Sequence, residues 1–248
     1  MLKRLYLLPI LALILALGLP SAGLAQKSPA QPTGQAAVGK VNVKLLAPEG
    51  LKRVDGLNPE VDAYIKKVEP KFKLNVLALY ADPKEWDAFV ANVKGNKGAS
   101  IPKFAMICVP RKMAKKSFTD AAVRKEHKRY ANWFSLVANN RPMAAVLTSQ
   151  GNAKLKEFLG VDIGFKFKTD EFTKKFAETS NSLSLGAQVS FNVFGKTSKV
   201  FLTATSLQVA DKMIFLAYFE NSGPPDKLAE IQAKTIAWRS GVNSENYK

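Results

Sequence analysis

The sequence predicts an α+β fold in which helices cover both faces of an antiparallel or mixed sheet, an α/β/α sandwich. Three strand-like segments, 187–194, 199–209 and 213–219, follow one another with short turns between them, which is typical of an antiparallel meander. Segment 213–219, MIFLAYF, is apolar at every position, so both of its faces must be covered. Amphipathic helix patterns elsewhere in the chain provide that cover.

The chain begins with the layout of a secretory signal peptide over residues 1–25. Two basic residues near the start precede the apolar run 5–19, and small residues end at Ala25, after which we expect cleavage. The run is shorter than the roughly 20 apolar residues that span a bilayer, and an uncleaved anchor is the alternative. The layout predicts a periplasmic or secreted protein with no transmembrane span after signal cleavage.

Residues 26–39 are rich in proline, glutamine, alanine and glycine. They are predicted to form a flexible lead, because they bury too little apolar surface to order themselves. The folded part is expected over 40–248 as a single α+β domain. A sub-boundary near 140–150 is the alternative, because a chain of this length also fits two small domains.

Strands are predicted at 41–46 and at 72–80, where apolar and β-branched residues recur. Between them, Asn58 is the candidate N-cap of a helix and Pro59 suits its first position. We expect Pro70 to end that helix, because proline lacks the backbone N–H that a helix interior needs.

The clearest helix pattern lies between Asp82, the predicted N-cap, and Gly95, which suits a left-handed helix end. An apolar strand follows at 103–109, and its Cys108 is interpreted as a small buried hydrophobe rather than a reactive thiol. The apolar stripe of this helix consists of Trp86, Phe89, Val90 and Val93.

A longer helix is expected from Ser117, its predicted N-cap, to about Ala138. Downstream, the sequence predicts a weak strand at 143–148 and two short helices at 152–160 and 170–182. The helix that begins at Ser117 contains a basic cluster and the only histidine of the chain.

His127 falls within the apolar stripe of that helix when residues are placed at about 100° per step. It is therefore interpreted as a packed core residue, and a pH switch or catalytic base is the alternative. The basic cluster lies on the opposite face, so the two features are not expected to form one site. The stripe consists of Val123, Tyr130, Phe134 and Val137.

The basic cluster is a candidate anion-binding face. The chain has 37 basic and 20 acidic residues and a formal net charge of +17, which draws a protein toward anionic partners. A solvated helix surface is the alternative interpretation. The candidate residues are Arg124, Lys125, Lys128 and Arg129, with Lys112, Lys115 and Lys116 just upstream.

Familiar catalytic and cofactor-binding patterns are missing from the sequence. It contains no GxSxG, HExxH, CxxC, GxGxxG or P-loop motif. Paired carboxylates could hydrolyse glycosidic bonds, but each candidate is explained by a helix start or an exposed face. The sequence therefore predicts no catalytic residue, no metal site and no cofactor.

A final helix is expected over 224–241, with Leu228, Ile231 and Trp238 on one stripe and Gly241 at its end. Together with the preceding meander, this helix resembles the PsbP-like fold family, which includes the extrinsic protein of the photosynthetic oxygen-evolving complex and secreted bacterial relatives. The resemblance covers roughly residues 160–246. It implies an α/β/α sandwich with a non-enzymatic accessory role, and it provides no metal or partner site.

These observations predict an exported, non-catalytic accessory or binding protein of the cell envelope. The expected partner is an unknown envelope protein or an anionic surface, and export argues against nucleic acid. A hydrolase with an unrecognised active site is the alternative, and a purely structural envelope module is a third hypothesis.

Overall fold

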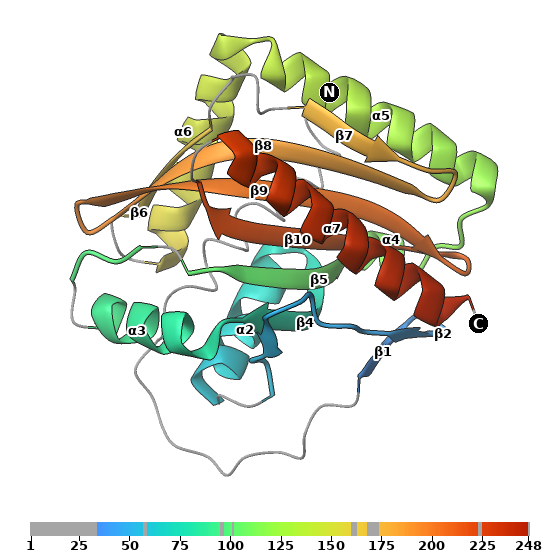
Figure 1. The fold of residues 1–248 in the computed structure, drawn as a ribbon, viewed down its shortest axis with the longest axis horizontal. Coiled ribbons are helices and arrows are strands. Elements are labelled where there is room, and N and C mark those ends of the chain that lie inside the picture. The colour runs from blue at the N-terminus through green and yellow to red at the C-terminus, as the bar shows by residue number, and fades with distance from the viewer. Residues whose placement is uncertain are drawn as a thin grey trace.

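The computed structural model describes residues 34–56, 59–94, 97–100, 102–159, 163–167, 174–222 and 225–247. The predicted signal peptide, most of the predicted lead, Asn58 and Gly95 lie outside these ranges. The helices are α2 (Pro59–Phe72), α3 (Pro83–Lys94), α4 (Arg111–Ala114), α5 (Asp120–Ala138), α6 (Arg141–Leu159) and α7 (Pro225–Asn246) (Figure 1).

An eight-stranded sheet forms the centre of the described chain, in the order β3-β4-β5-β10-β9-β8-β6, and β7 also pairs with β8. Every neighbouring pair is antiparallel, which confirms the α+β class. The strands are β3 (Lys52–Arg53), β4 (Leu74–Ala81), β5 (Phe104–Pro110), β6 (Ile163–Phe167), β7 (Lys174–Glu178), β8 (Ser182–Val193), β9 (Lys196–Val209) and β10 (Lys212–Asn221).

The predicted meander is confirmed as β8, β9 and β10. Phe194 and Gly195 form the two-residue turn between β8 and β9, and both have positive φ, 46° and 84°, as a tight hairpin turn of this length requires. Asn192 Oδ1 accepts a hydrogen bond of 3.0 Å from the Gly195 N–H. The turn therefore fixes the register of a hairpin whose second strand, β9, lies between β8 and β10.

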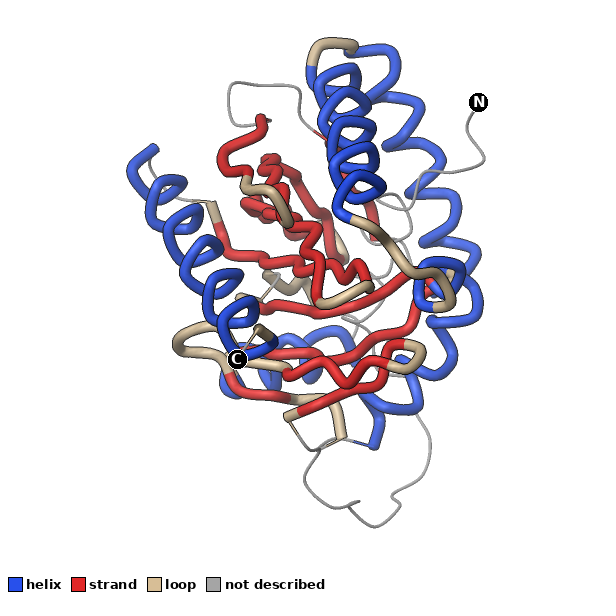
Figure 2. Tube along the Cα trace, turned by 90° about the vertical axis from the view of Figure 1, so that its right-hand side faces the viewer, coloured by secondary structure: helices blue, strands red, loops and turns tan. Residues whose placement is uncertain are grey.

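Helix α7 contacts β9, and α5 and β9 line a common hollow. Thr203 Oγ1 lies 2.8 Å from Thr235 Oγ1 of α7, whereas its neighbour Ala204 lines a hollow together with Tyr130 of α5. Successive side chains of a strand point to opposite faces, so the two contacts are on different sides (Figure 2). Helical cover of both complete faces stays a prediction.

The apolar segment 213–219 lies in β10, between β5 and β9. All seven of its side chains are buried, as its lack of a polar face predicts. Phe219 stacks on Phe104 of β5 with ring centroids 4.5 Å apart. The core of the sheet is therefore built around the strand that the sequence pattern singled out.

Two predictions of secondary structure are wrong in the middle of the chain. The predicted strand 143–148 lies inside α6, and so does the described part of the predicted helix 152–160. Residues 174–178, within the predicted helix 170–182, form β7 instead, because they pair with the edge of β8. Residues 141–150, at the alternative domain boundary, lie in α6, and both halves of the chain contribute strands to one sheet; the division into domains stays a prediction.

Several predicted element ends are also corrected. The helix α2 continues past Pro70 and ends at Phe72. The next residue, Lys73, has a φ of 56°, the left-handed conformation common just after a helix. The helix α7 continues past Gly241 to Asn246. The Asn246 side chain accepts a hydrogen bond of 2.7 Å from the Lys44 N–H and donates one of 3.0 Å to the Lys44 carbonyl. These tertiary contacts extend the helix.

The predicted flexible lead ends earlier than expected. Within 26–39, residues Gln35–Val38 form β1 and pair with β2 (Val41–Lys44) in a separate two-stranded sheet. Val38 and Val43 of this hairpin are 1% and 0% exposed, and Ala36 and Val41 pack against the same core. The composition of residues 26–39 did not reveal these contacts, because most of the apolar side chains that make them lie outside the segment or are small.

Candidate functional site

The scaffold of the candidate site is α5. Its N-cap is Thr119, whose side chain accepts a hydrogen bond of 3.3 Å from the Ala122 N–H, and not Ser117 as predicted. Asp120 accepts a hydrogen bond of 3.1 Å from the side chain of Gln208 on β9. The predicted buried stripe is confirmed, because Val123, His127, Tyr130, Phe134 and Val137 are all buried.

His127 is a core residue, as the position on the helix predicts. It is 1% exposed, and burial lowers the pKa of its imidazole to about 4, although the nearby Glu178 carboxylate acts in the opposite direction. Its Nε2 has no hydrogen-bond partner among the described residues. At neutral pH the ring is therefore uncharged, and it lies away from the solvent from which a substrate would approach.

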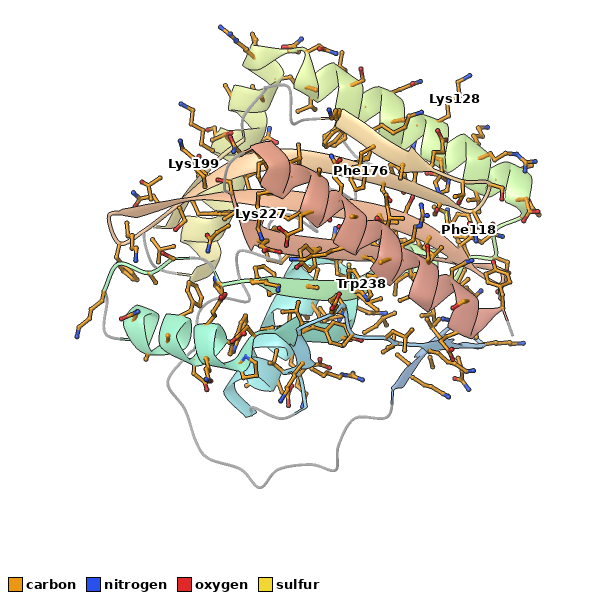
Figure 3. All side chains as sticks on the ribbon, in the orientation of Figure 1. Phe118, Lys128, Phe176, Lys199, Lys227 and Trp238 are labelled. Carbon is orange, nitrogen blue, oxygen red and sulfur yellow. The ribbon has the colours of Figure 1, made fainter. Side chains whose placement is uncertain are left out.

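The outward face of α5 carries the candidate cations. Arg124, Lys125 and Lys128 are exposed, and Figure 3 shows Lys128 pointing away from the sheet. None of the three forms an ion pair with a residue that the structure describes. Arg129 differs, because its guanidinium pairs with Glu126 and lies 5.2 Å from the centre of the Tyr130 ring.

The upstream lysines extend this positive charge toward α4. Lys112, Lys115 and Lys116 are all exposed, and within the described ranges none has an ion-pair partner. We define the basic α4–α5 surface as the six cations without such partners. They are Lys112, Lys115, Lys116, Arg124, Lys125 and Lys128.

The structure also brings together a serine and a lysine that the sequence did not link. Lys212 is 6% exposed, and its Nζ lies 3.4 Å from Ser117 Oγ, 3.0 Å from the Lys116 carbonyl and 3.1 Å from the Asp211 carboxylate. A serine–lysine pair can be catalytic when the amine is neutral. Here the Lys212 side chain donates to a hydroxyl, a carbonyl and a carboxylate at once, and a hydrogen bond from Ser117 lowers the pKa of Asp211, so the arrangement favours a structural anchor.

A second ionic group joins α7 to β10. The carboxylate of Glu220 accepts hydrogen bonds from Tyr218 Oη at 2.7 Å and from Lys234 at 3.5 Å, and lies 2.8 Å from Lys227 Nζ. Burial alone would raise the pKa of Glu220, but the hydrogen bonds from Lys227 and Tyr218 hold it below its usual value. Glu230 pairs with both lysines. The charges of this group are thus matched internally, and no unpaired one is available for catalysis.

Between α5 and the sheet lies a hollow with room for about one water molecule. It is lined by Tyr130, apolar side chains and Ser206, whose Oγ is buried without a partner among the described residues. We expect Ser206→Ala to raise the free energy of unfolding by about 1 kcal/mol, because it removes a buried hydroxyl that makes no hydrogen bond. Urea unfolding measures this change; a loss of stability would instead indicate an ordered water bound to the hydroxyl.

Other chemistry finds little support in the described residues. Burial raises the pKa of the Cys108 thiol, which makes it a poor nucleophile. In the described ranges, no three histidine, cysteine, aspartate or glutamate side chains are grouped so that they could hold a metal ion. No described helix is long and apolar enough to cross a membrane.

Comparisons with protein-family models, with curated proteins and with solved structures find no match. The resemblance to the PsbP-like fold family therefore stays a prediction. The basic α4–α5 surface gathers six exposed cations within seventeen consecutive residues, none of them ion-paired with a described residue.

Proposed function

We propose that this chain is an exported, non-catalytic accessory protein of the cell envelope that docks on an anionic surface through the basic α4–α5 surface. The observation that carries the proposal is the group of six exposed cations without ion-pair partners among the described residues. A solvated helix commonly intersperses acidic residues at a spacing of three or four. On α5, Glu126 pairs with Arg129, whereas Asp120, four residues before Arg124, accepts a hydrogen bond from Gln208 and forms no ion pair with Arg124.

The rigidity of α5 supports docking. Five buried side chains hold the helix against the sheet, so the cations on its outward face keep a fixed spacing. Each lysine or arginine near an anionic surface contributes about 1 kcal/mol. Six such residues together give attachment that weakens as salt screens their charge.

The environments of the two candidate bases, His127 and Lys212, support the non-catalytic part of the proposal. His127 is neutral and buried, and Lys212 is held by a carboxylate and a carbonyl beside Ser117. Export is supported by the signal-peptide layout of residues 1–25. These features favour an accessory role over a hydrolase.

The test removes three charges from α5 and three from elsewhere. We expect Arg124→Gln, Lys125→Gln and Lys128→Gln together to weaken retention on a sulfated-polysaccharide matrix and on vesicles containing phosphatidylglycerol by about a hundredfold, since each charge contributes about 1 kcal/mol. Retention is measured at low and at physiological ionic strength.

The matched control replaces three exposed lysines away from α5, namely Lys84, Lys196 and Lys199, by glutamine. This control has the same net charge as the α5 variant. Lys199 lies well apart from Lys128 (Figure 3). An equal loss in both variants would mean that only net charge matters, and it would remove the basic α4–α5 surface from the account.

A further inference from the structure

The hairpin formed by α5 and α6 exposes apolar side chains. The described chain has four exposed large apolar residues, and two of them, Leu136 at 50% and Val146 at 49%, lie on this hairpin. The turn between the two helices stands at the edge of the molecule, away from α7 and the β1–β2 hairpin (Figures 1 and 2). Leu136 and Val146 lie within about two helical turns of this α5–α6 turn along the chain.

Two partly buried apolar residues accompany the exposed ones, one on each helix of the hairpin. Trp133 and Met143 are partly buried, and both pack against the small cluster of Val137 and Ala144. Leu136 follows Trp133 by three residues, and Val146 follows Met143 by three, a spacing that makes side chains neighbours on a helix. We define the apolar ridge as Trp133, Leu136, Met143 and Val146.

All charged side chains within residues 127–156 of the hairpin are basic. No aspartate or glutamate occurs from residue 127 to residue 156, a stretch that includes most of the hairpin. Lys125, Lys128 and Leu136 share the outward side of α5 at about 100° per residue, and Leu136 lies roughly 16 Å along the axis from Lys125. Exposed Arg141 follows at the start of α6. Cations and exposed apolar groups thus occur on one continuous element.

We propose that the hairpin inserts its apolar ridge into an anionic lipid bilayer while the basic α4–α5 surface contacts the lipid headgroups. This inference rests on the proposed function and specifies the surface. A polyanionic polymer or an acidic protein needs only the cations, and would leave Leu136 and Val146 in water. A bilayer provides phosphates for the cations and acyl chains for the ridge, and tryptophan is enriched at that boundary.

The experiment uses the full folded chain and vesicles of phosphatidylglycerol with phosphatidylcholine. The ridge variant carries Leu136→Ser and Val146→Ser. Its control carries Leu46→Ser and Tyr247→Ser, which remove the other two exposed large apolar side chains. Vesicles with brominated acyl chains quench any tryptophan that reaches them, and among the three tryptophans only Trp133 is not fully buried.

If the ridge inserts, brominated vesicles quench the fluorescence of the native chain, and the ridge variant binds vesicles on the order of tenfold more weakly, whereas the control variant does not. Binding that depends on salt and on the α5 cations, without quenching and unchanged in the ridge variant, overturns insertion but leaves the proposed function standing. Retention on sulfated polysaccharide without vesicle binding likewise overturns insertion and leaves the proposed function standing. If the chain binds neither the polysaccharide nor the vesicles, both the insertion and the proposed function are overturned. Circular dichroism of each variant confirms that it is folded.

Discussion

Replacing Phe219 by alanine is expected to lower the free energy of unfolding by about 4 kcal/mol. The Phe219 side chain is 0% exposed and stacks on Phe104 with an angle of 1° between the rings. Phe104 in turn meets the edge of Trp86 on α3 at 6.5 Å. Removal of the ring therefore leaves a cavity between the sheet and a helix. The strands β5 and β10 cannot fill it by moving closer, because they are already hydrogen-bonded neighbours.

Urea unfolding followed by circular dichroism measures the change. Phe219→Leu is the matched control and should lose much less stability, about 1 kcal/mol, because it preserves most of the buried volume. A loss below 1 kcal/mol in the alanine variant would contradict the packing of β10 described above. Both values are compared at the same pH and temperature.

Acid is expected to destabilise the protein through His127. The pKa of this residue is about 4 in the folded protein, below the value of about 6.5 for an exposed histidine. Between these two values the unfolded chain binds more protons than the folded one, so stability falls as the pH falls. The contribution of His127 is fully present above pH 6.5 or so and is lost toward pH 4, with a total on the order of 3 kcal/mol.

His127→Leu tests this expectation, because leucine fits the apolar stripe and does not titrate. The free energy of unfolding is measured from neutral pH to about pH 4 for both proteins. Carboxylates titrate in both, so the difference between the curves isolates the histidine. Parallel curves would show that the imidazole is solvated in the folded state, and would restore it as a candidate base.

Local sequence patterns predicted the elements whose conformation depends least on contacts with distant parts of the chain. Asp82 caps α3, since its side chain accepts hydrogen bonds from the N–H groups of Lys84 and Glu85, as the spacing of Asp82 and Pro83 indicates. The buried stripe of α5 and the three meander strands were likewise visible. In each case the signal is a periodicity or a cap, and it lies within about a dozen neighbouring residues.

The candidate site was predictable only in part. The exposure of Lys125 and Lys128 follows from the position of each residue on a helix whose other face is apolar. The pairing of Arg129 with Glu126 is a local contact at a spacing of three, and the angular position of Arg129 on the helix does not by itself reveal it. The contact between Ser117 and Lys212 joins residues far apart in the sequence, so no local sequence pattern could predict it.

The sequence by itself determined the α+β class, the meander, the burial of His127 and the positive outward face of α5. Only the tertiary structure decided that residues 174–178 form a strand, that 143–148 continue a helix, and that Gln35–Val38 are ordered. The reason is physical. Helical amphipathicity and caps arise among near neighbours, whereas a short polar segment becomes a strand only if a distant edge offers it backbone partners, as β8 does for β7.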